Sequence, residues 1–206
     1  MEIQNNKEEI PFSYYADLLS KADPAEITAR TGIHPVDGTF HVTLLGNEYA
    51  ITQSPPCLKG GGCDSSRGDT IPIPTQTFLI RYLLEGKSVP NAGTWKTFRE
   101  MPWGELYIKP YTGRVLTRAA FTFGTRLAAF RAACEKMGAA AIPNGDAGYE
   151  FSFIGDYKVR ILVWEGDDEF PPNAQILYSD NFEDGFAPED RVVTGDILIT
   201  TIKSAM

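Results

Sequence analysis

The sequence predicts an α+β fold in which a mostly antiparallel sheet and flanking helices form a single domain over residues 1–206. Helical patterns come before and after clusters of strand patterns, without the regular strand–helix alternation of a doubly wound sheet. Two segments carry alternating apolar residues on both sides of a turn, which is typical of antiparallel hairpins. With 206 residues, of which 43% are hydrophobic and 22% charged, the chain is long enough to bury a core.

Two short helices and a hairpin are expected first. Residues 10–21 have a helical pattern, and Asp23 and Gly32 are placed as the cap and the terminator of a second helix. Residues 39–52 predict two strands joined by a tight turn at Gly46-Asn47.

A loop separates this hairpin from the next helix. Residues 53–74 contain four prolines and four glycines, so they predict a long loop, which is a candidate lid over a binding site. Residues 74–86 predict an amphipathic helix. An expected strand at 104–109 then leads into the longest helical stretch, residues 113–137, which Gly124 is expected to kink or divide.

The last part of the chain predicts an antiparallel meander and a closing helix. The first two strands meet at a Gly155-Asp156 turn, and residues 174–179 supply the third strand. A helix begins at Pro188, and the two acidic residues after it suit a helix N-terminus.

Charge and composition bear on the partners. The net charge of −8 disfavours binding to nucleic acid, because such a surface repels phosphate backbones. No stretch approaches the roughly 18 to 20 apolar residues that span a bilayer, and the start of the chain has no apolar signal segment, so no membrane partner is expected. Three cysteines, an odd number, fit a reducing compartment, and a cytoplasmic location is expected.

Aromatic and basic side chains gather in the stretch "GTWKTFREMPWGELY". Aromatic walls with a few polar groups describe a small-molecule pocket, and they equally describe a corner of the core whose indole N–H groups are hydrogen-bonded. The candidate ligand-binding residues are Trp95, Arg99, Trp103, Tyr107 and, from a later segment, Trp164.

The acidic stretch "WEGDDEFPP" is the second candidate site. Asp167, Asp168 and Glu169 bring several carboxylate oxygens within reach of one divalent cation, although the spacing is not that of an EF-hand. The alternative is a strand-end turn in which Gly166 supplies the backbone conformation, the acids stay in water and Phe170 folds back to the core.

Cys57 and Cys63 bracket a glycine-rich stretch, "CLKGGGC", and form the third candidate. Their spacing is wider than that of a usual zinc pair, and His34 or His41 would have to complete a metal site in space. A thiol loop that binds a metal or responds to redox is one interpretation, and a glycine-rich loop without chemistry is the other.

Several stretches of the chain resemble one uncharacterised prokaryotic family, domain of unknown function 3786. The resemblance covers roughly residues 25–203 and rests on "YLLEG", "GTWKTFREMPWGELY", "DAGYEF", "VWEGDDEFPPNAQILYSD" and "APEDRVV". It implies an anaerobic, cytoplasmic setting and cofactor-linked metabolism, although this chain lacks the cysteine cluster that some relatives use for an iron–sulfur module. It transfers no activity and no catalytic residue onto this sequence.

Three functions follow from these observations. The first is a binding or accessory protein that holds a small cofactor, planar or containing a metal, in the aromatic pocket. The second is a protein–protein interaction module whose acidic surface binds a basic partner. The third is an enzyme that uses a divalent cation held by Asp167, Asp168 and Glu169.

Overall fold

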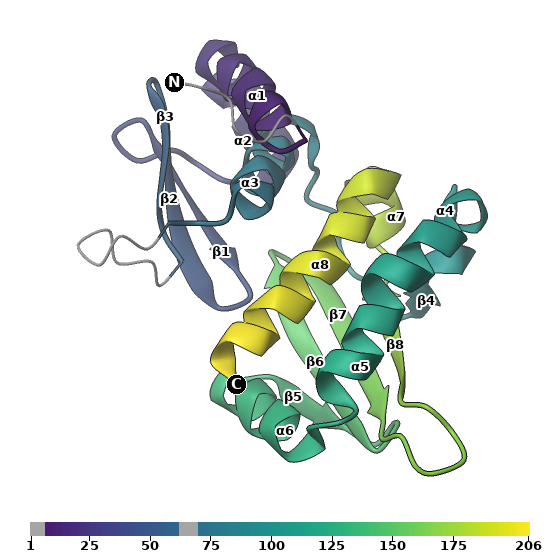
Figure 1. Cartoon of the computed structure of the whole chain (residues 1–206). Helices are drawn as coiled ribbons and strands as arrows, with labels where there is room; N and C mark the ends of the chain where they lie inside the picture. Colours follow the sequence, from purple (N-terminus) through teal and green to yellow (C-terminus); the bar gives the residue numbers. More distant parts are fainter. Residues whose placement is uncertain (1–6, 62–69) are drawn as a thin grey trace. The chain divides into compact units, whose positions relative to one another are not determined.

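The computed structural model describes residues 7–61 and 70–206. The chain divides into two compact units, Met1–Ser88 and Val89–Met206, and each is described here by itself (Figure 1). Both units combine helices with antiparallel strands, so the predicted α+β class is confirmed. The expectation of a single domain stays a prediction.

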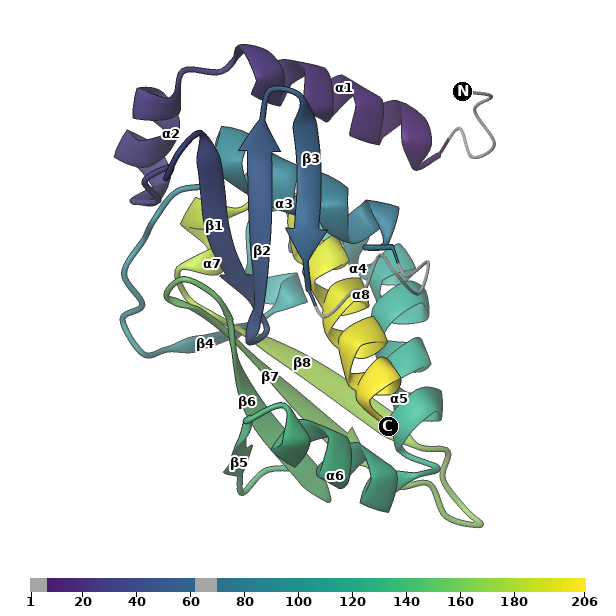
Figure 2. The same cartoon turned by 90° about the vertical axis from the view of Figure 1, so that its left-hand side faces the viewer.

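Unit 1 consists, in its described part, of helices around a three-stranded sheet with the order β3-β2-β1. Helix α3 runs along one face of these strands, and α1 packs against α3 (Figures 1 and 2). In chain order the elements are α1 (Glu9–Lys21), α2 (Pro24–Thr31), β1 (Thr39–Leu44), β2 (Asn47–Gln53), β3 (Pro56–Gly60) and α3 (Ile73–Glu85).

Local sequence signals account for most of unit 1. The Asp23 side chain accepts a hydrogen bond from the Ala25 N–H at 2.9 Å, which caps α2 as predicted. The hairpin is confirmed, but its turn lies one residue earlier than predicted. Leu44 pairs with Asn47, and the turn residues Leu45 and Gly46 both have positive φ values, 48° and 77°. This is the backbone of a type I′ turn, whose twist suits a hairpin.

The segment 53–74, predicted as one long loop, contains a strand. β3 pairs with β2 from Gln53↔Pro56 to Tyr49↔Gly60. Its position at the sheet edge tolerates Pro56, because a proline has no N–H to contribute to a ladder. The lid that was predicted here falls partly on residues 62–69, outside the described residues.

Unit 2 is built on a five-stranded antiparallel path, β5-β6-β7-β8-β4. Its elements are β4 (Trp95–Thr97), the 3₁₀ turn η2 (Phe98–Glu100), α4 (Gly104–Tyr111), the π-helical η3 (Thr112–Thr117), α5 (Arg118–Phe123), α6 (Leu127–Lys136), β5 (Ala140–Ile142), β6 (Ala147–Ile154), β7 (Tyr157–Trp164), β8 (Asn173–Ser179), α7 (Phe182–Gly185) and α8 (Pro188–Ala205).

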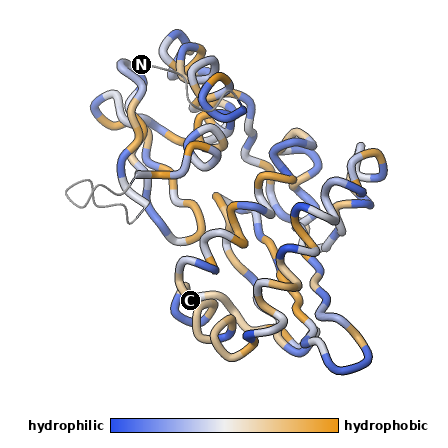
Figure 3. Tube along the Cα trace, in the orientation of Figure 1, coloured by the Kyte–Doolittle hydropathy of each residue, from blue (hydrophilic) through white to orange (hydrophobic). Residues whose placement is uncertain are grey.

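Large buried residues recur at every second position of β6, β7 and β8, so the core of unit 2 lies on one face of the sheet. Helices α5 and α8 lie on that face (Figures 1 and 2). The predicted meander is therefore confirmed, with its turn at Gly155-Asp156. Figure 3 shows the strands as largely hydrophobic and the connection between β7 and β8 as hydrophilic. Buried residues at alternate positions of these strands include Ala147, Tyr149, Phe151 and Phe153 in β6, Tyr157, Val159, Ile161 and Val163 in β7, and Ala174, Ile176 and Tyr178 in β8.

The strand predicted at 104–109 is wrong, because this segment is helix α4. The apolar residues in "GELYIK" do not alternate across a sheet. Leu106 is 70% exposed and Ile108 lines a pocket. The strand of this region is β4, which pairs with β8 through Trp95↔Ser179 and Thr97↔Leu177.

Gly124 divides the long helical stretch as predicted. α5 ends at Phe123 and α6 begins at Leu127. A Cβ on Gly124 would lie 2.5 Å from the Pro172 side chain and 2.9 Å from the Trp164 carbonyl, so only glycine fits this approach of the helix to the β7–β8 connection.

In the part of the chain that the structure describes, no helix is both long enough and apolar enough to cross a membrane.

Candidate functional site

The corner from β4 into α4 is fixed by a capping box. The backbone N–H and the hydroxyl of Thr97 donate to Glu100 Oε2 at 2.7 and 2.8 Å. These hydrogen bonds, the backbone one first, lower the pKa of Glu100, so its carboxylate stays charged and keeps the turn closed. The turn directs Phe98 into the core and leaves Arg99 exposed.

The start of α4 is held in a conformation that few residues adopt. Trp103, the residue before α4, has a φ of 66°, which lies in the left-handed region, and it is 68% exposed. The next residue, Gly104, has no space for a side chain, since a Cβ would lie 1.9 Å from the Phe98 carbonyl oxygen. Non-glycine residues with such backbone conformations occur where the surrounding structure enforces them, and they cluster at functional sites.

Directly after α4 the helix changes to the wider turns of a π-helix, η3. Pro110, inside α4, has no N–H to give to the carbonyl of Leu106, and the π-helical η3 begins two residues later. Gly195 of α8 allows a close approach to η3, because a Cβ there would lie 2.6 Å from the Val115 side chain. Such wide turns occur mostly as short insertions and are frequent at functional sites.

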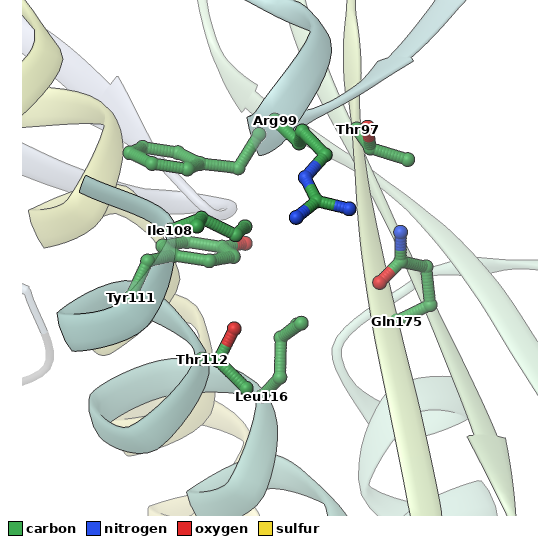
Figure 4. Close-up of a pocket in the computed structure, with 8 residues that line it drawn as sticks. Thr97, Arg99, Ile108, Tyr111, Thr112, Leu116 and Gln175 are labelled. Carbon is green, nitrogen blue, oxygen red and sulfur yellow. The ribbon is translucent and has the colours of Figure 1, made fainter. Parts of the chain in front are cut away.

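A pocket of about 380 Å³ lies where these elements meet β8. This volume is within the range of small-molecule sites. Figure 4 shows the side chains from the η2 turn, from α4 and η3, and from β8 around one open space. The lining residues are Thr97, Phe98, Arg99, Ile108, Tyr111, Thr112, Leu116 and Gln175.

A buried aromatic stack forms one wall of the pocket. The rings of Phe98 and Tyr111 are parallel within 5°, with centroids 4.0 Å apart. The Tyr111 and Tyr178 hydroxyls are 3.0 Å apart, and the Tyr178 hydroxyl donates to the Arg191 carbonyl at 3.1 Å. Burial raises the pKa of both tyrosines, so both hydroxyls stay neutral, and the wall is rigid and uncharged.

Arg99 is the one charged residue among the eight described residues that line the pocket. Its Nε lies 2.8 Å from Glu105 Oε2, and its Nη2 lies 3.5 Å from Glu105 Oε1. In Figure 4 the guanidinium projects into the space in front of Gln175.

Of the five predicted ligand-binding residues, the structure places only Arg99 in this lining. Trp95, in β4, has the Arg160 guanidinium 3.8 Å above its ring. Trp103 and Tyr107 are exposed on α4, and Trp164 is half-buried at the end of β7. A site formed by all five therefore finds no support in the geometry, and the roles of the other four residues stay predictions.

The acidic stretch is a turn with internal hydrogen bonds. Asp167 Oδ1 accepts from the Glu169 and Phe170 N–H groups at 2.9 and 2.7 Å, and the Asp167 N–H donates to the Phe170 carbonyl. Asp168 and Glu169 are exposed. Phe170 is 67% exposed, so it does not fold back to the core as expected.

Among the residues that the structure describes, no group of three or more His, Cys, Asp and Glu side chains could hold a metal ion. Nothing in the geometry therefore favours a cation at the acidic turn. In unit 1, His34 is exposed and His41 Nδ1 lies 3.2 Å from Glu48 Oε1. Cys57 is an exposed free cysteine in β3, whereas Cys63 lies outside the described residues, so the thiol loop stays a prediction.

Most of the pocket lining could not be assigned from sequence. The sequence predicts Leu116 in a long helix, Tyr111 and Thr112 beside it, and Gln175 in a strand, and no local pattern indicates that these residues meet in space. One signal was present: Pro110 before a long helical pattern marks a local break, and breaks of this kind can form sites.

One family model, described as "Domain of unknown function (DUF3786)", matches residues 23–201. The match confirms the resemblance found in the sequence over nearly the same range. No curated protein and no solved structure shows a significant match to the chain.

Proposed function

Since the chain belongs to the DUF3786 family, whose description gives no activity, we propose from the geometry of unit 2 that it is a binding protein for a small organic molecule. The observation that carries this proposal is the pocket of about 380 Å³ between η2, α4, η3 and β8. The cytoplasmic, anaerobic setting that the resemblance implies is part of the proposal, as is a role in handling a cofactor or metabolite.

The lining suits a ligand with a flat or apolar body and a polar end. Ile108, Leu116 and the Phe98–Tyr111 stack supply an apolar wall, and Arg99 and Gln175 supply hydrogen-bonding groups. Small-molecule sites commonly combine a mostly apolar lining with a few polar groups that orient the ligand. No residue of the pocket is assigned a catalytic role, because the eight described lining residues include no acid–base pair and no nucleophile with an activating base.

The test is native mass spectrometry of the protein purified without oxygen, with and without a filled pocket. Leu116→Trp fills the pocket, and Thr117→Trp places the same side chain on the neighbouring, exposed position of η3 as the matched control. We expect a bound small molecule in the wild type and in Thr117→Trp that Leu116→Trp lacks. Equal occupancy in all three proteins would contradict the proposal.

A second candidate, a protein interaction module, is favoured by the outer face of α4. We define the α4 ridge as Trp103, Leu106 and Tyr107, which are 68%, 70% and 36% exposed. Their spacing of three and four residues places them on one face of the helix. The pocket residue Ile108 directly follows Tyr107 and so lies on a different face of the helix, and the pocket residue Tyr111 is buried, so no residue of the ridge lines the pocket.

Site-specific photocrosslinking tests the second candidate. A photoreactive residue at Leu106 should capture a protein that the same residue at Phe121, which is 58% exposed on α5, does not capture. The captured protein should be lost when Trp103 is replaced by alanine. Identical capture at both positions would rule out the α4 ridge as a specific interface.

A further inference from the structure

We propose that the ligand of the pocket carries a single negative charge, a carboxylate bound by Arg99, and that Glu105 weakens its binding and disfavours a second negative charge. This inference rests on the proposed function and names the chemical class of the ligand. It rests on the Arg99 guanidinium, of which one edge faces Glu105 and the other faces the pocket, and on the negative charge of Glu105.

Glu105 occupies one edge of the Arg99 guanidinium. Nε and Nη2 face the two carboxylate oxygens at 2.8 and 3.5 Å. Within the described part of the chain, Nη1 has no hydrogen-bond partner. In Figure 4 both terminal nitrogens point toward the open space between Tyr111 and Gln175. The edge formed by Nη1 and Nη2 is therefore open to a planar acceptor from the pocket, and a carboxylate matches its geometry with two parallel hydrogen bonds.

The charges of Arg99 and Glu105 disfavour the other common ligand ends. An ammonium group would meet Arg99, the single charged residue of the described lining, and be repelled. A phosphate monoester carries close to two negative charges, but Arg99 is already paired with Glu105. The second charge would have no cation, and it would be repelled by the Glu105 carboxylate. A neutral amide would lose the charge-assisted part of the hydrogen bond.

Glu105 also acts as a competitor. The Glu105 side chain is 73% exposed and that of Arg99 is 62% exposed, so the ion pair between them is weak. A carboxylate of the ligand can therefore replace Glu105 on the guanidinium. The pair keeps the guanidinium positioned at the pocket mouth when no ligand is bound, and the ligand then shares or displaces Glu105. Removing the Glu105 charge should therefore strengthen binding of an anion and leave a neutral ligand unaffected.

The experiment is an NMR titration with four probes that share a phenyl group and a short chain. They are 4-phenylbutyrate, 4-phenylbutyramide, 4-phenylbutylamine and phenethyl phosphate, and dissociation constants come from the amide shifts of Thr112 and Gln175. For the wild type we expect the carboxylate to bind about fivefold more tightly than the amide, the upper end for a solvent-exposed ion pair. Arg99→Gln should remove this difference, and Glu105→Gln should tighten the carboxylate about threefold without changing the amide. Arg126→Gln, an exposed arginine outside the pocket lining, should behave as the wild type.

Two outcomes would overturn the inference. If the carboxylate and the amide bind equally well, or if Glu105→Gln weakens the carboxylate, the anion preference is wrong while the pocket remains a binding site. If none of the probes shifts the two amides, the inference also fails, and Leu116→Trp in native mass spectrometry decides separately whether the pocket binds any small molecule.

Discussion

The guanidinium of Arg191 donates a hydrogen bond of 2.8 Å from Nη1 to the carbonyl of Pro102, the residue before the exposed Trp103. Its other nitrogens donate to the carbonyls of Phe186 and Glu183 at 3.0 and 3.2 Å, and the residue is only 3% exposed. One side chain at the start of α8 therefore joins α7 to the turn that begins α4. Because the pocket and the α4 ridge both depend on the position of α4, Arg191 supports both candidate sites.

Replacing Arg191 by methionine should lower the free energy of unfolding by about 3 kcal/mol or more, because one buried carbonyl and two part-buried carbonyls lose a charged donor. Urea unfolding followed by circular dichroism measures this change. Arg191→Lys keeps the charge but not the fork of donors, so it should recover only part of the loss. A loss below about 1 kcal/mol in the methionine variant, the size of one ordinary hydrogen bond, would show that this contact does not hold α4.

The two buried tyrosines should respond unequally to loss of their hydroxyls. The Tyr178 hydroxyl gives its proton to the Arg191 carbonyl, so it accepts from Tyr111. Tyr178→Phe then leaves the buried Tyr111 hydroxyl without its acceptor and should cost about 2 kcal/mol, whereas Tyr111→Phe keeps the Tyr178 hydrogen bond and should cost about 1 kcal/mol. Urea unfolding of both variants gives the two values, and the reverse order would contradict this assignment of donor and acceptor.

Trp103 should be replaceable by glycine at little cost. Trp103→Gly and Trp103→Ala both remove the indole, so their difference reports the strain of φ 66° alone. We expect the glycine variant to be about 1 kcal/mol more stable than the alanine variant, because glycine adopts the left-handed region without steric penalty. Equal stabilities in thermal or urea unfolding would show that this turn relaxes when the indole is removed.

The parts of the fold that the sequence predicts are those governed by local rules. The Asp23 cap and the alternating β7 residues follow such rules, and the structure contains both. The Gly124 break is also present, because glycine is a poor helix residue, although a distant segment, the β7–β8 connection, is what requires a glycine there. The segment 104–109 was assigned incorrectly because its apolar residues serve neither a strand nor the core. Leu106 lies on the α4 ridge and Ile108 lines the pocket, so tertiary context overrides their apolar pattern.

The candidate site was predicted only in part, for a similar reason. Arg99 could be nominated because it stands within a dense aromatic stretch. Leu116 and Gln175 reach the same space from a π-helix and from a strand far along the chain, and neither a π-helix nor a non-local approach leaves a periodic pattern in the sequence.

The acidic turn should depend on Asp167 and not on its two neighbours. Asp167→Ala removes the acceptor of two backbone N–H groups and should cost about 1 kcal/mol, whereas Asp168→Ala and Glu169→Ala should change stability by less than about 0.5 kcal/mol. Thermal unfolding with and without added Mg²⁺ or Ca²⁺ checks the metal hypothesis at the same time. A rise in Tm with metal that all three variants lose would establish a cation site after all.

The free energy of unfolding should depend on pH through the carboxylate of Glu150 on β6. Burial raises its pKa, but hydrogen bonds from Arg160 at 2.8 and 2.9 Å and from Lys158 at 3.1 Å outweigh this, and the folded-state pKa is lowered. The stabilisation is therefore present above the unfolded pKa of about 4.3 and is lost as pH falls through the folded pKa. The difference in unfolding free energy between the wild type and Glu150→Gln should be full at neutral pH and shrink in acid. A difference that stays constant in acid would contradict the lowered pKa.

The central claim, that unit 2 binds a small molecule in the pocket beside η3, is tested most directly by a fragment screen with backbone amide NMR. A library of soluble ring-containing fragments is added to the isotope-labelled protein, and the amides that shift are mapped. The account predicts hits that shift Thr97, Thr112, Leu116 and Gln175 together and that are lost in Leu116→Trp but kept in Thr117→Trp. Hits confined to Leu106 and Tyr107, or hits that Leu116→Trp leaves unchanged, would contradict it and would leave the α4 ridge as the functional surface.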